Sequence, residues 1–299
     1  MGFHAGIDRP EQGGLTMRDY SLGLYEKAMP TGLSWEKMLE CTAASGFDTL
    51  EISVDESDYR LSRLQWDAQQ RRELRQLSAS VGVPIKTMCL SGHRKYPLGS
   101  HDPEIRKRSL QIMEEAVNLA TDIGVRIIQL AGYDVYYEES DADTVAWFGE
   151  NLSKGVEYAA KHGVILGFET METAFMDTVT KSMRWVDQVN SPYLGVYPDI
   201  GNLKNASVLY GSDLLGDIRR GTGHIFAAHL KETRPGIYRD MDFGTGHTEY
   251  EACVKLLWEL GVRHFTGEFW FQQGRDYEHE TAAASRFLRD KIESVIGKE

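Results

Sequence analysis

The stretch VILGFETMETAFMDTVTKSMRWVDQVNSPYLGVYPD, residues 164–199, decides the fold. It begins with a short apolar run that ends in Glu169, and it continues through a polar and apolar segment near residues 178–189 that is typical of a surface helix. It ends with a second apolar run that stops at Asp199. A strand, a helix and a second strand in this order predict a right-handed crossover and a parallel sheet.

The same alternation extends in both directions along the chain and predicts a single domain over residues 18–299. Ser34 and Gly46 bound the first helix as cap and stop signals, and no Pro-, Gly- or Ser-rich linker divides the chain. Eight strands with eight helices close into a (β/α)₈ TIM barrel. We expect strands at residues 21–25, 48–54, 83–90, 126–132, 164–169, 193–199, 224–230 and 264–270, and helices at 35–45, 73–82, 103–123, 142–162, 178–189, 212–219, 248–260 and 277–295.

Composition limits the partners and the location of the protein. The net charge of −12 over 299 residues argues against nucleic acid or an anionic membrane surface as a partner. The cysteines Cys41, Cys89 and Cys253 form no CxxC pair, and no run reaches the roughly 18 apolar residues of a membrane span, so we expect a cytoplasmic protein. Residues 1–17 lack the apolar core of a signal peptide and are interpreted as a disordered extension or a cloning remnant.

Four polar residues follow the apolar runs in the second half of the chain: Glu169, Asp199, His229 and Glu268. Strand ends are commonly polar, so any one of them alone could be an ordinary surface residue. In a (β/α)₈ barrel, however, the carboxyl ends of all strands meet at one mouth. Three carboxylates and one imidazole gathered there predict a site for one divalent metal ion, Mn²⁺, Zn²⁺ or Mg²⁺.

The two glutamates suggest proton transfer. Glu169 and Glu268 follow the fifth and eighth strands, on two sides of the predicted mouth. One glutamate would remove a proton beside a carbonyl, the metal would stabilise the enediolate, and the other glutamate would return a proton from the opposite face. The same ligands would also suit a metal-dependent hydrolase.

Basic and polar residues near the same mouth indicate the substrate. The trio His93, Arg94 and Lys95 follows the third strand and, unless it is only a solvated loop, predicts capture of a phosphate or a polyol. Gly244 begins a glycine-rich stretch that lacks the GxGxxG spacing of a dinucleotide site, so we expect neither a nicotinamide nor a flavin. The further residues predicted to bind substrate are Glu51, Glu172, Asn202, Lys231 and Arg234.

Six motifs carry a family resemblance: LGLYEKAMP (22–30), LEISVDES (50–57), MCLSGHRKYPLGS (88–100), IIQLAGYDVYYEE (127–139), VYPDIGNL (196–203) and HLKETRPG (229–236). Over residues 18–295 the sequence resembles the L-ribulose-5-phosphate 3-epimerases, also called L-xylulose-5-phosphate 3-epimerases, of the xylose-isomerase-like barrel superfamily. The motifs are spread over most of the barrel, so the resemblance is specific.

The resemblance implies interconversion of L-xylulose 5-phosphate and L-ribulose 5-phosphate in L-ascorbate or related pentose catabolism. It implies that Glu169, Asp199, His229 and Glu268 bind the metal and that the two glutamates exchange the proton. It also implies a homodimer. One departure is Thr245, which stands where the family pattern is expected to be acidic.

Three other functions fit part of the same pattern. A sugar isomerase moves the carbonyl between carbons 1 and 2 and could use the same metal and enediolate. A barrel nuclease needs a broad basic face, which an acidic chain does not favour. A non-catalytic sugar-phosphate sensor would have no use for two opposed glutamates.

Overall fold

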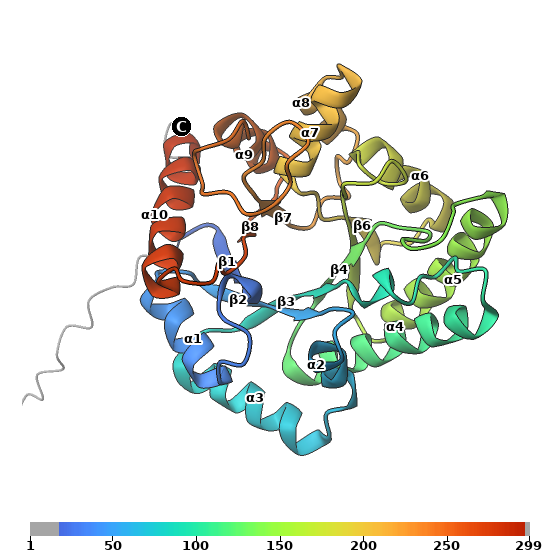
Figure 1. The fold of residues 1–299 in the computed structure, drawn as a ribbon, viewed down its shortest axis with the longest axis horizontal. Coiled ribbons are helices and arrows are strands. Elements are labelled where there is room, and N and C mark those ends of the chain that lie inside the picture. The colour runs from blue at the N-terminus through green and yellow to red at the C-terminus, as the bar shows by residue number, and fades with distance from the viewer. Residues whose placement is uncertain (1–17, 297–299) are drawn as a thin grey trace, which may run out of the picture.

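The computed structural model describes residues 18–296, so the prediction made for residues 1–17 lies outside the described residues. Eight parallel strands alternate with helices and curl into a barrel (Figure 1), which confirms the predicted (β/α)₈ architecture. In the sheet the strands follow the order β6-β5-β4-β3-β2-β1-β8-β7. They are β1 Ser21–Tyr25, β2 Thr49–Val54, β3 Ile85–Leu90, β4 Ile127–Ala131, β5 Ile165–Glu169, β6 Leu194–Val196, β7 Ala228–Leu230 and β8 His264–Gly267.

The helices surround the barrel and begin and end at residues with clear roles. The Ser34 side chain accepts a hydrogen bond from the Lys37 N–H and caps α1, as predicted. Gly46, at φ +84°, has the left-handed backbone that ends this helix. The helices are α1 Trp35–Ala44, α2 Asp58–Leu61, α3 Ala68–Val81, α4 Pro103–Ile123, α5 Ala142–Lys161, α6 Val179–Val189, α7 Ile200–Tyr210, α8 Leu214–Arg219, α9 Tyr250–Glu259 and α10 Tyr277–Ile296.

The connection between β6 and β7 differs from the prediction. The sequence predicts one short helix near 212–219, whereas the structure has two, α7 and α8. Helix α7 begins directly after Asp199, whose side chain accepts a hydrogen bond from the Asn202 N–H and caps the helix. Seven of its eleven residues are buried, so its sequence lacks the polar face by which a surface helix is recognised.

The hydrophobic core lies between the strands and the outer helices. Strand β2 is buried at all six positions, as expected for a parallel strand that is covered on both sides. On β5, Phe168 packs against Phe148 of α5, with ring centroids 6.3 Å apart. This packing fixes the strand that ends in Glu169.

The barrel closes between β6 and β7 by isolated bridges instead of a continuous ladder. Val196 pairs with Ile225, and Asp199 pairs with His229. The Val196 N–H donates to the His224 carbonyl at 2.8 Å, and the His229 N–H donates to the Pro198 carbonyl at 2.9 Å. The backbones approach so closely here that a Cβ on Gly195 would lie 2.3 Å from the His224 carbonyl oxygen. This seam places Asp199 beside His229.

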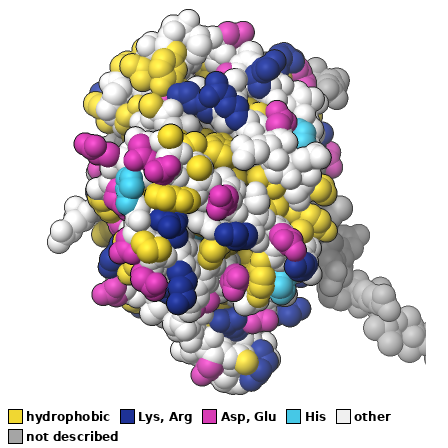
Figure 2. Space-filling view, turned by 90° about the vertical axis from the view of Figure 1, so that its right-hand side faces the viewer, with side chains coloured by type: hydrophobic (Ala, Val, Ile, Leu, Met, Phe, Trp, Pro, Cys, Tyr) yellow, Lys and Arg dark blue, Asp and Glu magenta, His cyan; other side chains and the backbone are white. Residues whose placement is uncertain are grey.

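One face of the molecule is seen in Figure 2, on the side where α5 lies in Figure 1. Basic and acidic side chains are interspersed over this face. It therefore has no continuous basic surface of the kind that binds a nucleic-acid backbone.

Candidate active site

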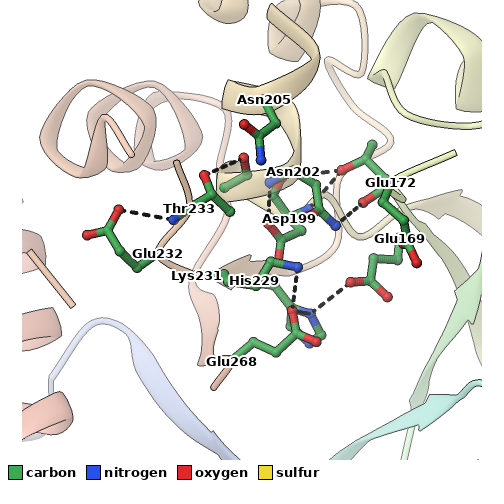
Figure 3. Close-up of polar contacts among 12 residues, drawn as sticks. Glu169, Glu172, Asp199, Asn202, Asn205, His229, Lys231, Glu232, Thr233 and Glu268 are labelled. Carbon is green, nitrogen blue, oxygen red and sulfur yellow. Dashed lines mark hydrogen bonds and ion pairs between the residues drawn. The ribbon is translucent and has the colours of Figure 1, made fainter. Parts of the chain in front are cut away.

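The structure brings the four predicted metal ligands together. Glu169, Asp199, His229 and Glu268 each offer one ligand atom, and these atoms all lie within 4.8 Å of one another. All four side chains are buried, and Figure 3 shows them converging from different elements. The arrangement has the composition and spacing of a site for one divalent cation.

The local backbone explains why these side chains converge. Glu169 is the last residue of β5, and His229 is the central residue of β7. Asp199 caps α7 through Oδ1, which leaves Oδ2 without a hydrogen-bond partner. Glu268 follows β8, and its N–H donates to the Leu230 carbonyl at 3.0 Å.

The imidazole of His229 is held from both of its nitrogens. Its Nε2 lies 2.7 Å from Oε1 of Glu51, while its Nδ1 lies 3.3 Å from Glu268 and 3.6 Å from Glu169. An ionised carboxylate only accepts hydrogen bonds, so Nε2 carries a proton and directs it at Glu51. Nδ1 faces two carboxylates and has no hydrogen-bond partner. Burial would lower the pKa of His229, but Glu51 and then Glu268 raise it well above its usual value. A cation bound at Nδ1 would take the place of the proton that these charges favour there.

The charges of the cluster also favour a cation. Lys231 lies 3.2 Å from Asp199 Oδ2 and 3.2 Å from Glu268 Oε2. Burial would lower the pKa of Lys231, but Asp199 and then Glu268 raise it, so the amine stays charged. Four buried carboxyl groups, Glu51 included, face one ammonium and one imidazole, and a divalent cation bound among them would add positive charge that favours their ionised forms.

The two glutamates differ in their electrostatic surroundings. Burial and then the charge of Glu268 raise the pKa of Glu169. Burial would also raise the pKa of Glu268, but Lys231 and His229 outweigh it and hold that pKa well below its usual range. Burial raises the pKa of Asp199 well above its usual range, despite the opposing effect of Lys231.

Two residues predicted to bind substrate have other partners. Glu51 was predicted to accept sugar hydroxyls, but it is fully buried and both of its oxygens are engaged, by His229 and by the Tyr197 hydroxyl. His93 is also buried, and its Nε2 faces the Ser109 carbonyl at 3.2 Å. Burial lowers the pKa of His93 to about 4, so it is neutral at pH 7. Both side chains therefore have partners within the protein, and their role in substrate binding stays a prediction.

The remaining basic residues differ in their readiness to bind an anion. Arg94 donates to the Tyr133 hydroxyl at 3.0 Å and lies 3.8 Å from Glu172. Lys95 is exposed, with its amine 5.4 Å from the Tyr96 ring centroid. Arg234 is exposed and donates to the Thr245 carbonyl, at the position where the family pattern is expected to be acidic. Of these three side chains, only Arg94 contacts the loops that follow β4 and β5, at the end of the barrel where the proposed metal ligands lie.

Asn202 lies beside the site but acts on the backbone. Its backbone N–H donates a hydrogen bond to Oδ1 of Asp199, and its Nδ2 donates to the Thr170 carbonyl at 2.8 Å. Thr170 in turn accepts a hydrogen bond from the Asp199 N–H at 3.0 Å. These bonds tie the end of β5 to the start of α7 and so fix the positions of Glu169 and Asp199 relative to each other.

Sequence reasoning did not identify Gln129, Tyr197 or Thr266 as part of the site. Gln129 donates a hydrogen bond to Glu169, and Tyr197 bonds to both Glu51 and Thr266. Each of the three is a polar residue within or next to an otherwise apolar run. That position was the available signal, because a buried polar side chain needs a partner.

Comparison with known proteins assigns the family. A family model described as xylose isomerase-like TIM barrel matches residues 39–291. SgbU of Escherichia coli (strain K12), which carries a provisional name as an L-ribulose-5-phosphate 3-epimerase, is 42% identical over 286 residues, or 93% of this chain and 99% of SgbU. UlaE of Escherichia coli O139:H28 (strain E24377A / ETEC), named L-ribulose-5-phosphate 3-epimerase, is 39% identical over 272 residues, or 91% of this chain and 94% of UlaE. The chain belongs to the L-ribulose-5-phosphate 3-epimerase family of xylose isomerase-like TIM barrels.

Solved structures of more distant proteins share the fold. D-psicose 3-epimerase of Clostridium cellulolyticum H10, solved with D-tagatose, is 18% identical with a TM-score of 0.76 and covers 91% of this chain and 99% of its own. An L-ribulose 3-epimerase structure is also 18% identical with a TM-score of 0.76, covering 93% of this chain and 96% of its own. Because the chain belongs to the family of SgbU and UlaE, this protein is a carbohydrate epimerase of the isomerase class.

Across residues 18–296, none of the helices combines the length and the apolar character needed to cross a bilayer.

Proposed function

We propose that this epimerase inverts carbon 3 of a ketopentose phosphate and interconverts L-xylulose 5-phosphate and L-ribulose 5-phosphate. The observation that carries the proposal is the placement of Glu169 and Glu268 in one cluster with Asp199 and His229. The names of SgbU and UlaE support the substrate. The inversion is redox-neutral, so it needs neither a nicotinamide nor a flavin.

Glu169 and Glu268 are the proposed proton carriers. One glutamate takes the proton from carbon 3, and the electrons of the broken C–H bond pass into an enediolate. The other glutamate delivers a proton to the opposite face of carbon 3 and re-forms the ketone with inverted configuration. Each glutamate acts as the base in one direction of the reaction and as the acid in the other.

The chain's own charges support the enediolate. Glu169, Asp199, His229 and Glu268 would hold one Mn²⁺, Zn²⁺ or Mg²⁺ ion, which when bound supplies Lewis-acid polarisation of the carbonyl. Lys231 keeps a positive charge 3.2 Å from both Asp199 and Glu268. That fixed charge favours the developing oxyanion over the neutral ketone.

Arg94 is the proposed contact for the substrate's phosphate. Its guanidinium stacks 4.6 Å from the Tyr136 ring centroid and donates to the Tyr133 hydroxyl, so its orientation is fixed before substrate binds. Tyr133 follows β4 and Glu172 follows β5, which places Arg94 at the same end of the barrel as the metal ligands. A planar, permanently charged guanidinium is well suited to a phosphate.

Epimerisation is tested by the position of the exchanged hydrogen. L-xylulose 5-phosphate incubated with the enzyme and Mn²⁺ in deuterated water should give L-ribulose 5-phosphate carrying deuterium at carbon 3, seen by NMR. Deuterium at carbon 1 or an aldose product would favour the alternative, a sugar isomerase on the same metal site. Binding of the sugar phosphate without any exchange would favour the sensor.

A further inference from the structure

A complete layer of polar side chains lies inside the barrel below the metal ligands. Glu51 comes from β2, Gln129 from β4, Tyr197 from the residue after β6, and Thr266 from β8. All four are fully buried. Interior layers of such barrels take four side chains from alternate strands and are usually filled by bulky apolar residues. Here every member of the layer is polar.

The layer lies directly beneath the ligands. Tyr197 precedes Asp199 by two residues, and Thr266 precedes Glu268 by two. Because side chains two apart in extended backbone point the same way, each lies one step deeper than its ligand. Gln129 reaches the site from the neighbouring strand and donates a hydrogen bond to Glu169.

The hydrogen bonds of the layer have a defined direction. The Tyr197 hydroxyl donates to Oε2 of Glu51 at 2.9 Å. Its single proton is then used, so the contact of 2.8 Å between Tyr197 and Thr266 has the Thr266 hydroxyl as donor. Oε1 of Glu51 accepts from Nε2 of His229 at 2.7 Å. Both oxygens of Glu51 therefore accept from specific donors.

We propose that Glu51 is a positioning residue that holds His229 in the Nε2–H tautomer and so presents Nδ1 to the cation. Tyr197 and Thr266 fix the carboxylate that does this. The inference rests on the metal site of the proposed function, but it concerns only how the imidazole is oriented. A carboxylate buried without such a role would be unfavourable compared with an apolar residue of similar size.

The test measures metal binding without any sugar. We expect Glu51→Gln, which keeps the size of the side chain and removes its charge, to bind Mn²⁺ about 10- to 100-fold more weakly than the unsubstituted protein, by calorimetry. The visible spectrum of the Co²⁺-loaded protein should shift as well, because the geometry at Nδ1 changes. Tyr197→Phe removes one donor to Glu51 and should weaken Mn²⁺ binding in the same direction but less.

Glu26→Gln is the matched control. Glu26 is also a buried glutamate, but its carboxylate pairs with Arg60 at 2.9 Å and with Arg63 at 2.5 Å instead of with a ligand. Its loss should lower the melting temperature and leave Mn²⁺ affinity unchanged. Equal loss of affinity in Glu26→Gln and Glu51→Gln would show general destabilisation and overturn the inference.

Unchanged Mn²⁺ affinity and an unchanged Co²⁺ spectrum in Glu51→Gln would also overturn it. If that variant does not fold, Tyr197→Phe decides by the same two measurements. A protein whose Mn²⁺ affinity depends on Glu51 but which leaves L-xylulose 5-phosphate unchanged would keep the inference and refute the proposed function.

Discussion

The two halves of the barrel contribute differently to the site. Strands β5 to β8 carry or precede all four proposed ligands, and β6 and β7 are only three residues long. Strands β1 to β4 have five or six residues each and pair with their neighbours, with one register shift between Leu50 and Glu51. They supply supporting groups, among them Glu51 and Gln129. We call β5 to β8 the ligand half and β1 to β4 the regular half. Strands β6 and β7 of the ligand half are short, so the residues after them turn into the mouth, and side chains of the regular half hold the ligands in place.

The largest effect is expected in the ligand half. Glu169→Gln and Glu268→Gln should each lower kcat by about 100- to 10,000-fold, because an amide cannot exchange a proton with carbon 3. Circular dichroism should show an intact fold. Glu115→Gln, on the outer helix α4, is the control and should keep full activity. Full activity in either site variant would remove that residue from proton transfer.

His93, which follows β3, should affect stability and leave catalysis unchanged. Its pKa is lowered to about 4 by burial, whereas in the unfolded chain it is near 6.5. The unfolded state therefore binds the extra proton below about pH 6.5, and stability falls as the pH drops from there towards 4. In His93→Gln, urea unfolding should show a loss between pH 7 and 4.5 that is about 2–3 kcal/mol smaller than in the unsubstituted protein.

Equal pH dependence in the two proteins would mean that His93 has the same pKa in the folded and the unfolded state. A changed KM at pH 7 in His93→Gln would instead support its predicted role in substrate binding.

Arg94 tests whether the regular half also touches the substrate. A charged hydrogen bond contributes about 1.5–3 kcal/mol, so Arg94→Gln should raise KM for the pentulose phosphate by about 10- to 150-fold. The unphosphorylated pentulose should show no such change. Arg234→Gln is the control, since its guanidinium is engaged by the Thr245 carbonyl. An equal rise in KM for both sugars would show that Arg94 supports the structure of the mouth and does not bind the phosphate.

Asp199 is both a proposed metal ligand and the cap of helix α7. The smallest expected effect separates these two roles. Asp199→Asn keeps a side-chain oxygen that can cap α7, whereas Asp199→Ala loses the cap and should lower the free energy of unfolding by about 1 kcal/mol. Both variants should lose Mn²⁺ affinity. Equal stability of the two in chemical denaturation would show that the cap contributes nothing.

The sequence predicted the barrel and the cluster because both depend on strand ends, which composition marks clearly. It could not predict the role of Glu51, because every residue of β2 is buried and no alternation shows which side chains face the barrel interior. His93 and Arg94 lie in one 3₁₀ turn, where successive side chains point in different directions, so adjacent basic residues did not share a site. Helix α7 was missed because most of it is buried and its exposed end, Val208–Tyr210, is apolar, so no polar face marks it in the sequence.

The seam between β6 and β7 has a consequence for how the enzyme would respond to metal. Asp199 and His229 stand on its two sides and are joined there by a single bridge. An ion coordinated by both would act as a cross-link at this joint, so part of its binding free energy would resist local opening of the barrel. Hydrogen exchange of the backbone amides around Val196 and Ile225 should slow when Mn²⁺ is added in the absence of substrate.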